Sequence, residues 1–267
     1  MSVSIEIKDN TRYASVDYWN ERYSNEEEYD WLGDYELFKN LIHRHVQDKC
    51  SKILMVGCGN SQLSEQMFQD GYQNIISTDI SEVCIENQQK AFPHLTWKVA
   101  DIKNLKDFED GTFDIVIKKA TLDALLVGEK SQWDPSEEAE EGIGNCLSEI
   151  SRVLKPQNGR FLSLTFAQPH FRTPFYAKTK YEWSVDHETF GTGFHYYCFI
   201  MTKGQSLHEV HISSATYISK LTLNVNQDVI SSSDEEDFTS KLDLSFESDK
   251  DSLDSLPNDE IKSLKIE

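Results

Sequence analysis

The chain has 267 residues, 38% of them apolar and 11% aromatic, which is enough for one well-buried core and short for two full domains. Its 46 Asp and Glu residues against 26 Lys and Arg give a formal charge of -20. Such a charge disfavours nucleic acid and anionic lipid as partners and favours a basic protein. No apolar run could cross a bilayer and no signal peptide is evident. We therefore expect a cytoplasmic protein, monomeric and without membrane contact.

The five cysteines are spread along the chain, with no C-x-x-C pair and no Cys/His group at zinc-ligand spacing. An odd number of separated thiols is typical of reduced cysteines in or near the core of an intracellular protein. The sequence therefore predicts no metal site. The cysteines are Cys50, Cys58, Cys84, Cys146 and Cys198.

The N-terminal part, residues 1–50, is rich in aromatic side chains that include Trp19, Tyr23 and Trp31. We expect this segment to be helical. The three aromatic residues have two interpretations, either as one face of an amphipathic helix that only packs on the domain or as part of a ligand site. The sequence of the segment alone leaves both open.

Residues 51–215 alternate short apolar runs with longer amphipathic stretches, which is typical of an α/β fold with a mostly parallel sheet. Continuous apolar runs indicate buried parallel strands. A fifth run, residues 95–100, has a mixed composition that suits a sheet edge. The four buried strands are expected at 52–57, 74–79, 113–118 and 160–166.

The clearest helix signal is the string DPSE that starts at Asp134. It predicts Asp134 as the N-cap, a proline in the first helical position and an acidic residue two positions later. Apolar residues continue at helical spacing as far as Leu154, and Pro156 should follow the end of the helix.

The C-terminal part differs in character from the sheet region. Aromatic, β-like stretches at 181–185 and 194–201 predict an antiparallel hairpin at the sheet edge. Between Ser231 and Glu267 there are 12 acidic residues against 4 lysines. We expect residues 216–267 to form an acidic, Ser-rich, disordered tail, because they cannot bury enough apolar surface to fold.

A glycine loop and two acidic residues follow the predicted strands. The loop GCGNS begins at Gly57, and Gln62 stands where a NAD-binding fingerprint requires a third glycine. Asp79 and Asp101 each end a predicted strand, so both carboxylates should lie at the edge of the sheet where open α/β folds bind ligands. The spacing suits Asp79 for the two hydroxyls of a ribose and Asp101 for the amino group of an adenine.

Several strings beyond this loop carry a more specific resemblance. They are YWNERY from Tyr18, YDWLGD from Tyr29, GCGNS from Gly57, DIS from Asp79, KATLDALL from Lys119 and PHFR from Pro169. Between about Tyr13 and Gly204 the chain resembles the elongation factor 1-alpha lysine methyltransferase family, within the class I S-adenosylmethionine-dependent methyltransferases. The resemblance implies a Rossmann-like fold with a mostly parallel seven-stranded sheet and an antiparallel C-terminal hairpin. It also implies a protein-lysine N-methyltransferase whose cofactor is S-adenosylmethionine and whose partner is elongation factor 1-alpha.

The resemblance also implies roles for individual residues. Aromatic faces suit the sulfonium cation of this cofactor, and the N-terminal aromatic residues would cover its methionine end. Lys119 would contact the cofactor through a stem that lines the pocket, with its amine at the methionine carboxylate or a backbone carbonyl. The implied cofactor-binding residues are Trp19, Tyr23, Trp31, Gly57, Asp79, Ile80, Asp101, Ile102 and Lys119, and the implied catalytic residues are Lys119 and Asp123.

The string at Lys118 departs from the family, in which we expect an acidic residue, a lysine and a glycine. Here the string is Lys118-Lys119-Ala120. If position 120 has a positive φ, Ala120 strains the loop by about 1 kcal/mol. A second hypothesis is therefore a cofactor-binding module with weak or no activity, and a third is an enzyme with a small-molecule substrate. The N-P-P-Y type of string found in adenine methyltransferases is absent at this position, which argues against nucleic acid.

The group that accepts the proton of the substrate amine is less well defined by the sequence. Asp123, Tyr196 or Tyr197 could orient the amine or relay its proton. Asp123 has a plain structural alternative, as a cap of the short helix after Thr121. For His170 and His195 (both in the aromatic C-terminal part) we expect hydrogen-bonded residues in the pocket wall rather than general bases.

Overall fold

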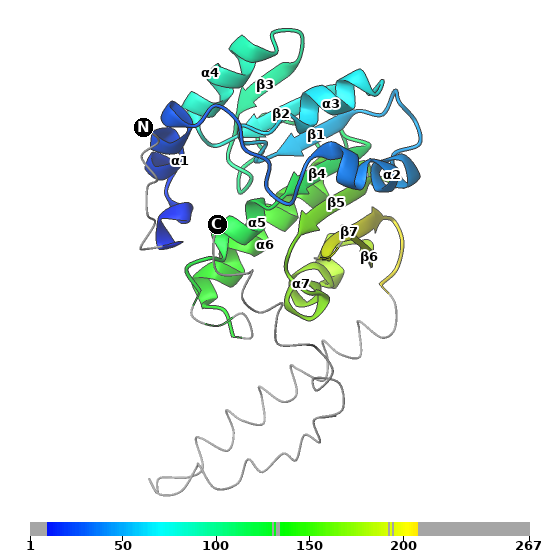
Figure 1. Cartoon of the computed structure of the whole chain (residues 1–267). Coiled ribbons are helices and arrows are strands. Elements are labelled where there is room, and N and C mark those ends of the chain that lie inside the picture. The colour runs from blue at the N-terminus through cyan, green and yellow to red at the C-terminus, as the bar shows by residue number, and fades with distance from the viewer. Residues whose placement is uncertain (1–9, 130, 132–133, 192, 194, 208–267) are drawn as a thin grey trace, which may run out of the picture. The chain divides into compact units, whose positions relative to one another are not determined.

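Seven strands form one sheet in the computed structural model, which describes residues 10–207 apart from 130, 132–133, 192 and 194. The strand order is β3-β2-β1-β4-β5-β7-β6; the first five strands are parallel, and β7 is antiparallel to both β5 and β6 (Figure 1). The predicted Rossmann-like α/β fold is therefore confirmed. The strands are β1 (Ile53–Val56), β2 (Ile75–Asp79), β3 (Thr96–Val99), β4 (Ile115–Lys119), β5 (Arg160–Thr165), β6 (Trp183–Phe190) and β7 (Tyr196–Lys203).

Helices cover both faces of this sheet. Figure 1 shows α4 beside the edge strand β3, and α7 beside β6 and β7. The first helix, α1, packs against α4. The helices are α1 (Val16–Asn25), α2 (Tyr35–His45), α3 (Leu63–Gln69), α4 (Glu82–Ala91), α5 (Thr121–Leu125), α6 (Glu137–Val153) and α7 (Pro169–Tyr176), with short 3-10 helices η1 (Asn10–Ala14) and η2 (Thr179–Tyr181).

The core has two halves, one on each face of the sheet, because successive side chains of a strand point to opposite faces. In β1, Leu54 and Val56 pack on the face covered by α5, α6 and α7. Ile53 and Met55 pack on the face covered by α2 and α3. All four residues of β1 are buried, which explains why this strand appears in the sequence as a continuous apolar run.

Helix α6 begins two residues later than the DPSE string predicts. The N-cap is Ser136, whose hydroxyl accepts the backbone N–H of Ala139 at 3.2 Å. Ser136 is held in place by the carboxylate of Glu129, which accepts hydrogen bonds from the Ser136 backbone N–H (2.7 Å) and hydroxyl (3.0 Å). The predicted N-cap, Asp134, therefore lies before the helix, whereas the predicted end before Pro156 is confirmed.

The C-terminal hairpin is longer than expected and is shifted along the sequence. Its strands pair from Trp183 opposite Lys203 to Phe190 opposite Tyr196. The second half of β6 is mostly exposed because this strand forms the edge of the sheet. Because these exposed positions are polar, the sequence lacks the alternation of apolar residues that would have predicted a strand beyond residue 185.

Two further expectations concern the boundaries of the chain's parts. The described part of the N-terminal segment is largely helical, while residues 1–9 and the predicted tail at 216–267 lie outside the described residues. Within the described ranges, no helix combines the length and the apolar character needed to cross a membrane.

The face of the sheet under α7 contains two buried cations beside one carboxylate. Lys118 is fully buried in β4, and its Nζ lies 3.6 Å from Oδ2 of Asp123 without a hydrogen-bond partner. Oδ1 of Asp123 instead accepts the Thr165 hydroxyl at 2.5 Å and Nη2 of Arg172 at 2.7 Å. Burial, opposed by Asp123 and reinforced by Arg172, lowers the pKa of Lys118 to about 8.

We predict that Lys118→Met stabilises the protein at pH 7 by about 1–3 kcal/mol, because Arg172 alone neutralises Asp123 and a buried charge without a hydrogen bond is removed. The folded protein holds the Lys118 proton less tightly than the unfolded chain does. Its destabilising effect is therefore complete below about pH 8 and declines as the pH rises toward 10.5, the ordinary value for lysine. Urea unfolding at pH 7 and pH 9.5 should show that the gap between variant and wild type narrows at the higher pH.

Lys203 provides a matched control, because it is also buried but its Nζ bonds the Ser151 hydroxyl (2.9 Å) and the Tyr181 carbonyl (3.0 Å). Lys203→Met should therefore destabilise the protein. A loss of stability in Lys118→Met, or an equal gap at both pH values, would contradict the predicted role of Lys118.

Candidate functional site

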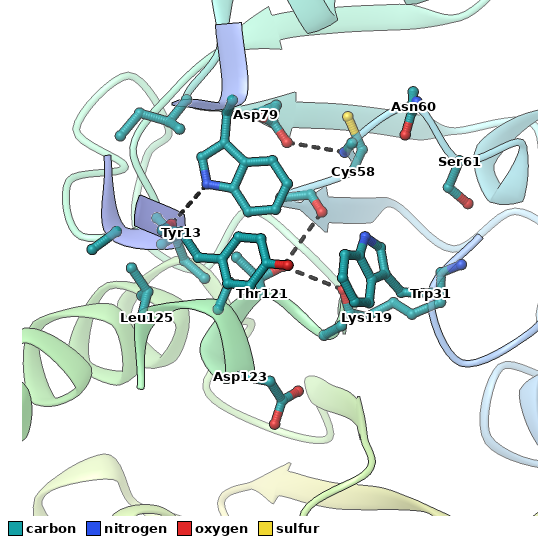
Figure 2. Close-up of a pocket in the computed structure, with 18 of the residues that line it drawn as sticks. Tyr13, Trp31, Cys58, Asn60, Ser61, Asp79, Lys119, Thr121, Asp123 and Leu125 are labelled. Carbon is teal, nitrogen blue, oxygen red and sulfur yellow. Dashed lines mark hydrogen bonds between the residues drawn. The ribbon is translucent and has the colours of Figure 1, made fainter. Parts of the chain in front are cut away.

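A cavity of about 290 Å³ opens at the carboxyl ends of β1, β2, β3 and β4, between the sheet and the N-terminal segment (Figure 2). This is the edge of the sheet at which open α/β folds bind ligands. The ten residues that the family resemblance implies for cofactor binding and catalysis all line this cavity. They are Trp19, Tyr23, Trp31, Gly57, Asp79, Ile80, Asp101, Ile102, Lys119 and Asp123.

The glycine loop after β1 has two residues with positive φ, Gly57 at +63° and Gly59 at +56°. A Cβ on Gly57 would lie 2.3 Å from Oγ1 of Thr121, so a side chain there is excluded by α5 as well as by the backbone angle. The Thr121 hydroxyl donates to the carbonyls of Val56 (3.2 Å) and Gly57 (3.3 Å). Position 57 therefore requires a glycine, because the loop after β1 contacts the first residue of α5 there.

Asp79 lies at the end of β2 and is held by two backbone donors. Its Oδ2 accepts the N–H of Gly59 at 2.9 Å and its Oδ1 accepts the N–H of Ser81 at 3.0 Å. Burial raises the pKa of this carboxyl, and the backbone donors oppose that shift. A carboxylate has about four lone-pair positions, so two remain for a ligand with neighbouring hydroxyls. This geometry fits the ribose of S-adenosylmethionine.

Asp101, Ile102 and Ile80 extend the wall of the cavity beyond Asp79. Asp101 follows β3, and its Oδ1 accepts the backbone N–H of Lys103 at 2.8 Å. Ile102 is buried in the core half under α6, whereas Ile80 is 37% exposed. The wall therefore offers apolar contacts and one polar group, which suits a flat heteroaromatic ring such as adenine.

Aromatic rings from the N-terminal segment form the opposite wall. Trp19 on α1 stacks on Tyr13 and Tyr23, with ring centroids 5.6 Å apart in both pairs, and its Nε1 donates to the Tyr13 carbonyl at 2.8 Å. The guanidinium of Arg22 lies 5.2 Å from the centroid of the Trp31 ring. Tyr23 is buried against the domain and Trp19 and Trp31 are half-buried, and all three rings line the cavity. Packing of this segment on the domain is therefore confirmed, and its role in binding a ligand stays a prediction.

The segment before Trp31 is tied to the glycine loop by side-chain bonds. Nδ2 of Asn60 donates to the Glu26 carboxylate at 3.2 Å, and the amide of Gln62 donates to Glu28 at 2.5 Å. The hydroxyl of Ser61 donates to Asp30. The N-terminal segment is therefore fixed over the cavity by polar contacts as well as by ring packing.

Lys119 uses the same carboxylate. Its Nζ lies 2.5 Å from Oδ1 of Asp30, and the Gly33 carbonyl is 3.5 Å away. The expected backbone carbonyl is thus the one of Gly33, while the nearer partner, Asp30, was not predicted. Contact of the amine with a cofactor carboxylate stays a prediction. Burial lowers the pKa of Lys119, and Asp30 opposes that effect. The acidic residue in the string Tyr29-Asp30-Trp31 is the signal that the sequence analysis overlooked.

Ala120 lies at the N-terminus of α5 with a φ of +61°, a left-handed conformation that favours glycine. The condition under which the sequence analysis expects strain at Ala120, a positive φ, is therefore met. Its backbone N–H donates to the Leu164 carbonyl at 3.0 Å, which fixes the end of β4 against β5. Ala120 lines the cavity, so any strain is stored in the cavity wall.

Other expectations about proton transfer need correction. Asp123 does not cap α5, because its carboxylate accepts hydrogen bonds from Arg172 and Thr165. The remaining candidates, His170, His195, Tyr196 and Tyr197, are not among the residues that line the cavity. Both histidines are exposed, and neither is a pocket-wall residue. In β7, Tyr197 pairs with Thr165 of β5 beyond the cavity.

Several lining residues were not proposed from the sequence. Tyr13, Tyr29 and Phe166 add aromatic surface, and Phe166 is 45% exposed. For Tyr13 and Tyr29, the only signal in the sequence was the high aromatic content of the N-terminal segment. Phe166 directly follows β5, and nothing in its sequence context indicated that this strand end borders the cavity.

Comparisons with known proteins agree with this geometry. A family model described as "Methyltransferase domain" matches residues 54–162. The chain is 38% identical over 242 residues to EEF1A lysine methyltransferase 4 of Mus musculus, which covers 88% of this chain and 94% of that protein. It is 32% identical to the eEF1A lysine and N-terminal methyltransferase of Homo sapiens over 61% of this chain and 23% of that longer protein. A methyltransferase structure from Pyrococcus furiosus shares the fold, with a TM-score of 0.50 and 16% identity over 67% of this chain and 88% of that chain.

The fold and the cavity thus define a class I methyltransferase, an enzyme that uses S-adenosylmethionine as its methyl donor. The identity over nearly the whole length of the mouse relative narrows the assignment further. The chain belongs to the EEF1A lysine methyltransferase family.

We predict that Asp30→Asn weakens cofactor binding by about tenfold, because it removes the charge that holds Lys119 and loosens the link to Ser61. Glu28→Gln is the matched control, since it neutralises an exposed acid of the same segment that bonds Gln62. Its affinity should stay within about twofold of wild type. Calorimetric titration with S-adenosylmethionine measures both, and equal affinity in all three proteins would show that Asp30 does not organise the cavity.

The strain at Ala120 leads to a separate prediction. Ala120→Gly should stabilise the protein by about 1 kcal/mol, because glycine adopts the left-handed conformation without a Cβ clash. The turnover rate should rise while cofactor affinity changes little, since methyl transfer is more sensitive to small displacements than binding is. Thermal unfolding and initial rates test this, and an unchanged rate would mean that the alanine does not disturb the active geometry.

Proposed function

We propose that this chain is a protein-lysine N-methyltransferase that acts on translation elongation factor 1-alpha. The observation that carries the proposal is the 38% identity over 94% of the mouse protein named EEF1A lysine methyltransferase 4. A second relative with the same name, from Bos taurus, matches over the same share of its length. The acidic charge of the chain also favours a basic protein substrate over a nucleic acid.

We assign eight of the lining residues to four tasks. Asp79 with Ile80 would hold the ribose, and Asp101 with Ile102 would hold the adenine. Gly57, which has no side chain, would let the loop come close to the cofactor. The rings of Trp19, Tyr23 and Trp31 would cover the methionine end. When bound, the cofactor supplies a methyl group that its sulfonium has already activated for attack by an amine.

The main requirement on the protein is then to present a neutral amine in line with that methyl group. Free lysine, with a pKa of about 10.4, is mostly protonated at neutral pH, and an apolar surrounding favours its uncharged form. The half-buried rings and the apolar residues Leu125, Val127 and Ala124 provide such a surrounding. Aromatic faces also attract the cationic sulfonium, so the same wall serves both reactants.

Lys119 and Asp123 were predicted to be catalytic, and each lines the cavity with an ionic partner already in place. We propose that both act by positioning. Lys119 would link β4 to the N-terminal segment through Asp30. Asp123 would hold α5 against α7 through Arg172, so that Ala120 and Thr121 stay under the cofactor. Because both side chains are engaged in ion pairs, neither would take the proton of the substrate amine. We propose that this proton leaves to solvent at the mouth of the cavity.

Transfer of labelled methyl groups from S-adenosylmethionine to purified elongation factor 1-alpha tests the proposal. Wild type should label the factor on a lysine, which digestion and mass spectrometry would locate. Asp79→Ala should abolish labelling and lower cofactor affinity at least about tenfold, because it removes charge-assisted hydrogen bonds worth about 1.5–3 kcal/mol each. Glu36→Gln, an exposed change on α2, serves as the control and should label normally.

The outcomes also separate the alternative functions. Cofactor binding without any transfer would favour the weakly active module, for which the left-handed conformation of Ala120 is the structural argument. Label in small molecules of a cell extract, with none in protein, would favour a small-molecule methyltransferase. Either result would contradict the proposed substrate.

A further inference from the structure

Two cysteines that are 26 positions apart in the sequence meet at Asp79. Sγ of Cys58, Sγ of Cys84 and a carboxylate oxygen of Asp79 all lie within 4.8 Å of one another. They come from three elements, the glycine loop after β1, the first turn of α4 and the end of β2. Figure 2 shows the sulfur of Cys58 beside the carboxylate of Asp79 at one end of the cavity. For convenience we call these three residues the dithiol cluster.

The dithiol cluster is held in place by backbone contacts. Asp79 is fixed by the N–H groups of Gly59 and Ser81, at 2.9 and 3.0 Å. The N–H of Cys84 in turn donates to the Ser81 hydroxyl at 3.1 Å, which caps α4. Little rearrangement is therefore needed to bring the three ligand atoms toward one point.

The cluster is also accessible from one side. Cys84 is 1% exposed and Asp79 is 6% exposed, so both are shielded from bulk solvent. Cys58 and Asp79 line the cavity, which provides an entry path for a small ion. A buried site with an open side and three donors has the layout of a metal site that keeps one coordination position free.

The donor set favours a soft divalent cation. Two cysteine sulfurs with one carboxylate oxygen suit zinc or cadmium better than magnesium or calcium, which prefer oxygen ligands. Zinc–sulfur bonds of about 2.3 Å and zinc–oxygen bonds of about 2.1 Å place tetrahedral ligands roughly 3.5–3.8 Å apart. The observed limit of 4.8 Å means that contraction by about 1 Å suffices.

The charge balance is also favourable. Two neutral thiols and one carboxylate carry a charge of -1. A divalent cation replaces one proton on each thiol, and both protons leave to solvent, so the loaded cluster again carries -1. Metal binding therefore adds no net charge to a buried place, where an uncompensated ion would be destabilising.

A disulfide between the same two cysteines is the competing possibility. Peroxide oxidation begins with a thiolate. Both cysteines are free thiols in the structure, and a cation that binds sulfur strongly can displace their protons. A disulfide would use both sulfurs, so the cation site requires the reduced protein.

We propose that Cys58, Cys84 and Asp79 bind a thiophilic divalent cation of the zinc type, and that this cation and the cofactor exclude one another. The exclusion rests on the proposed function, in which Asp79 holds the ribose. A cation on Asp79 uses the lone pairs that the ribose needs and occupies the floor of the cavity. The site would make methyl transfer sensitive to free zinc.

Cadmium is the probe for the site itself, because cadmium–thiolate bonds give an ultraviolet charge-transfer band. Titration of the reduced full-length protein should produce this band with one equivalent of Cd²⁺, and Zn²⁺ should bleach it by displacement. The band should be lost in Cys58→Ser and in Cys84→Ser. The controls Cys50→Ser, at an exposed thiol, and Cys146→Ser, at a buried one elsewhere, should keep it.

Two results would overturn the site. One is the absence of the band in wild type at excess Cd²⁺, and the other is its full retention in Cys84→Ser. Circular dichroism and thermal unfolding of each variant show whether it is folded. If Cys84→Ser does not fold, Cys84→Ala, which adds no polar group to the buried position, takes its place.

Competition tests the second half of the proposal. With Cd²⁺ at ten times its dissociation constant, the apparent dissociation constant for S-adenosylmethionine should rise about tenfold in wild type. In Cys84→Ser it should not respond to Cd²⁺. Independent binding of cofactor and Cd²⁺ would overturn mutual exclusion. If Cd²⁺ gives the band but no cofactor binds at all, the metal site stands and the proposed function fails, so the two failures are distinguishable.

Discussion

One carboxylate, that of Asp30, joins the three parts of the chain that enclose the cavity. Its Oδ1 accepts Nζ of Lys119 from the end of β4 and the hydroxyl of Ser61 from the glycine loop. Asp30 itself belongs to the segment that carries the aromatic wall. Because the pair with Lys119 is largely buried, loss of either partner would leave a charge without compensation. The position of the rings over the cavity therefore depends on an ion pair as much as on hydrophobic packing.

The end of β4 combines two features that a stable sheet would not need. Lys118 adds a second buried cation beside Asp123 and Arg172, and Ala120 takes a left-handed conformation. Both lie within two residues of Lys119, at the point where the strand reaches the cavity. Local destabilisation of this kind is typical of functional sites, where the surrounding structure holds residues in unfavourable states.

The dithiol cluster and the proposed ribose site share Asp79, so one carboxylate would serve two mutually exclusive ligands. This arrangement follows from the turn after β1, which brings Cys58 over the end of β2, and from α4, whose N-cap, Ser81, lies two residues after Asp79. The backbone donors of Gly59 and Ser81 fix the Asp79 carboxylate in the orientation that either proposed ligand would use.

The sequence by itself predicted the parallel strands and placed Gly57, Asp79 and Asp101 at one edge of the sheet, because buried parallel strands are continuous apolar runs and their carboxyl ends must meet at one edge. The rings of the N-terminal segment and Lys119 were assigned to the cavity only through the family resemblance. The sequence could not determine which partner each polar side chain takes. Lys119 forms an ion pair with Asp30, 89 positions away. Asp123 bonds Arg172 and does not cap the short helix α5. The spacing of the cysteines likewise predicted no metal site, whereas folding placed Cys58 and Cys84 together. Such contacts arise between elements that are distant in sequence, so only the packing of those elements in the tertiary structure decided them.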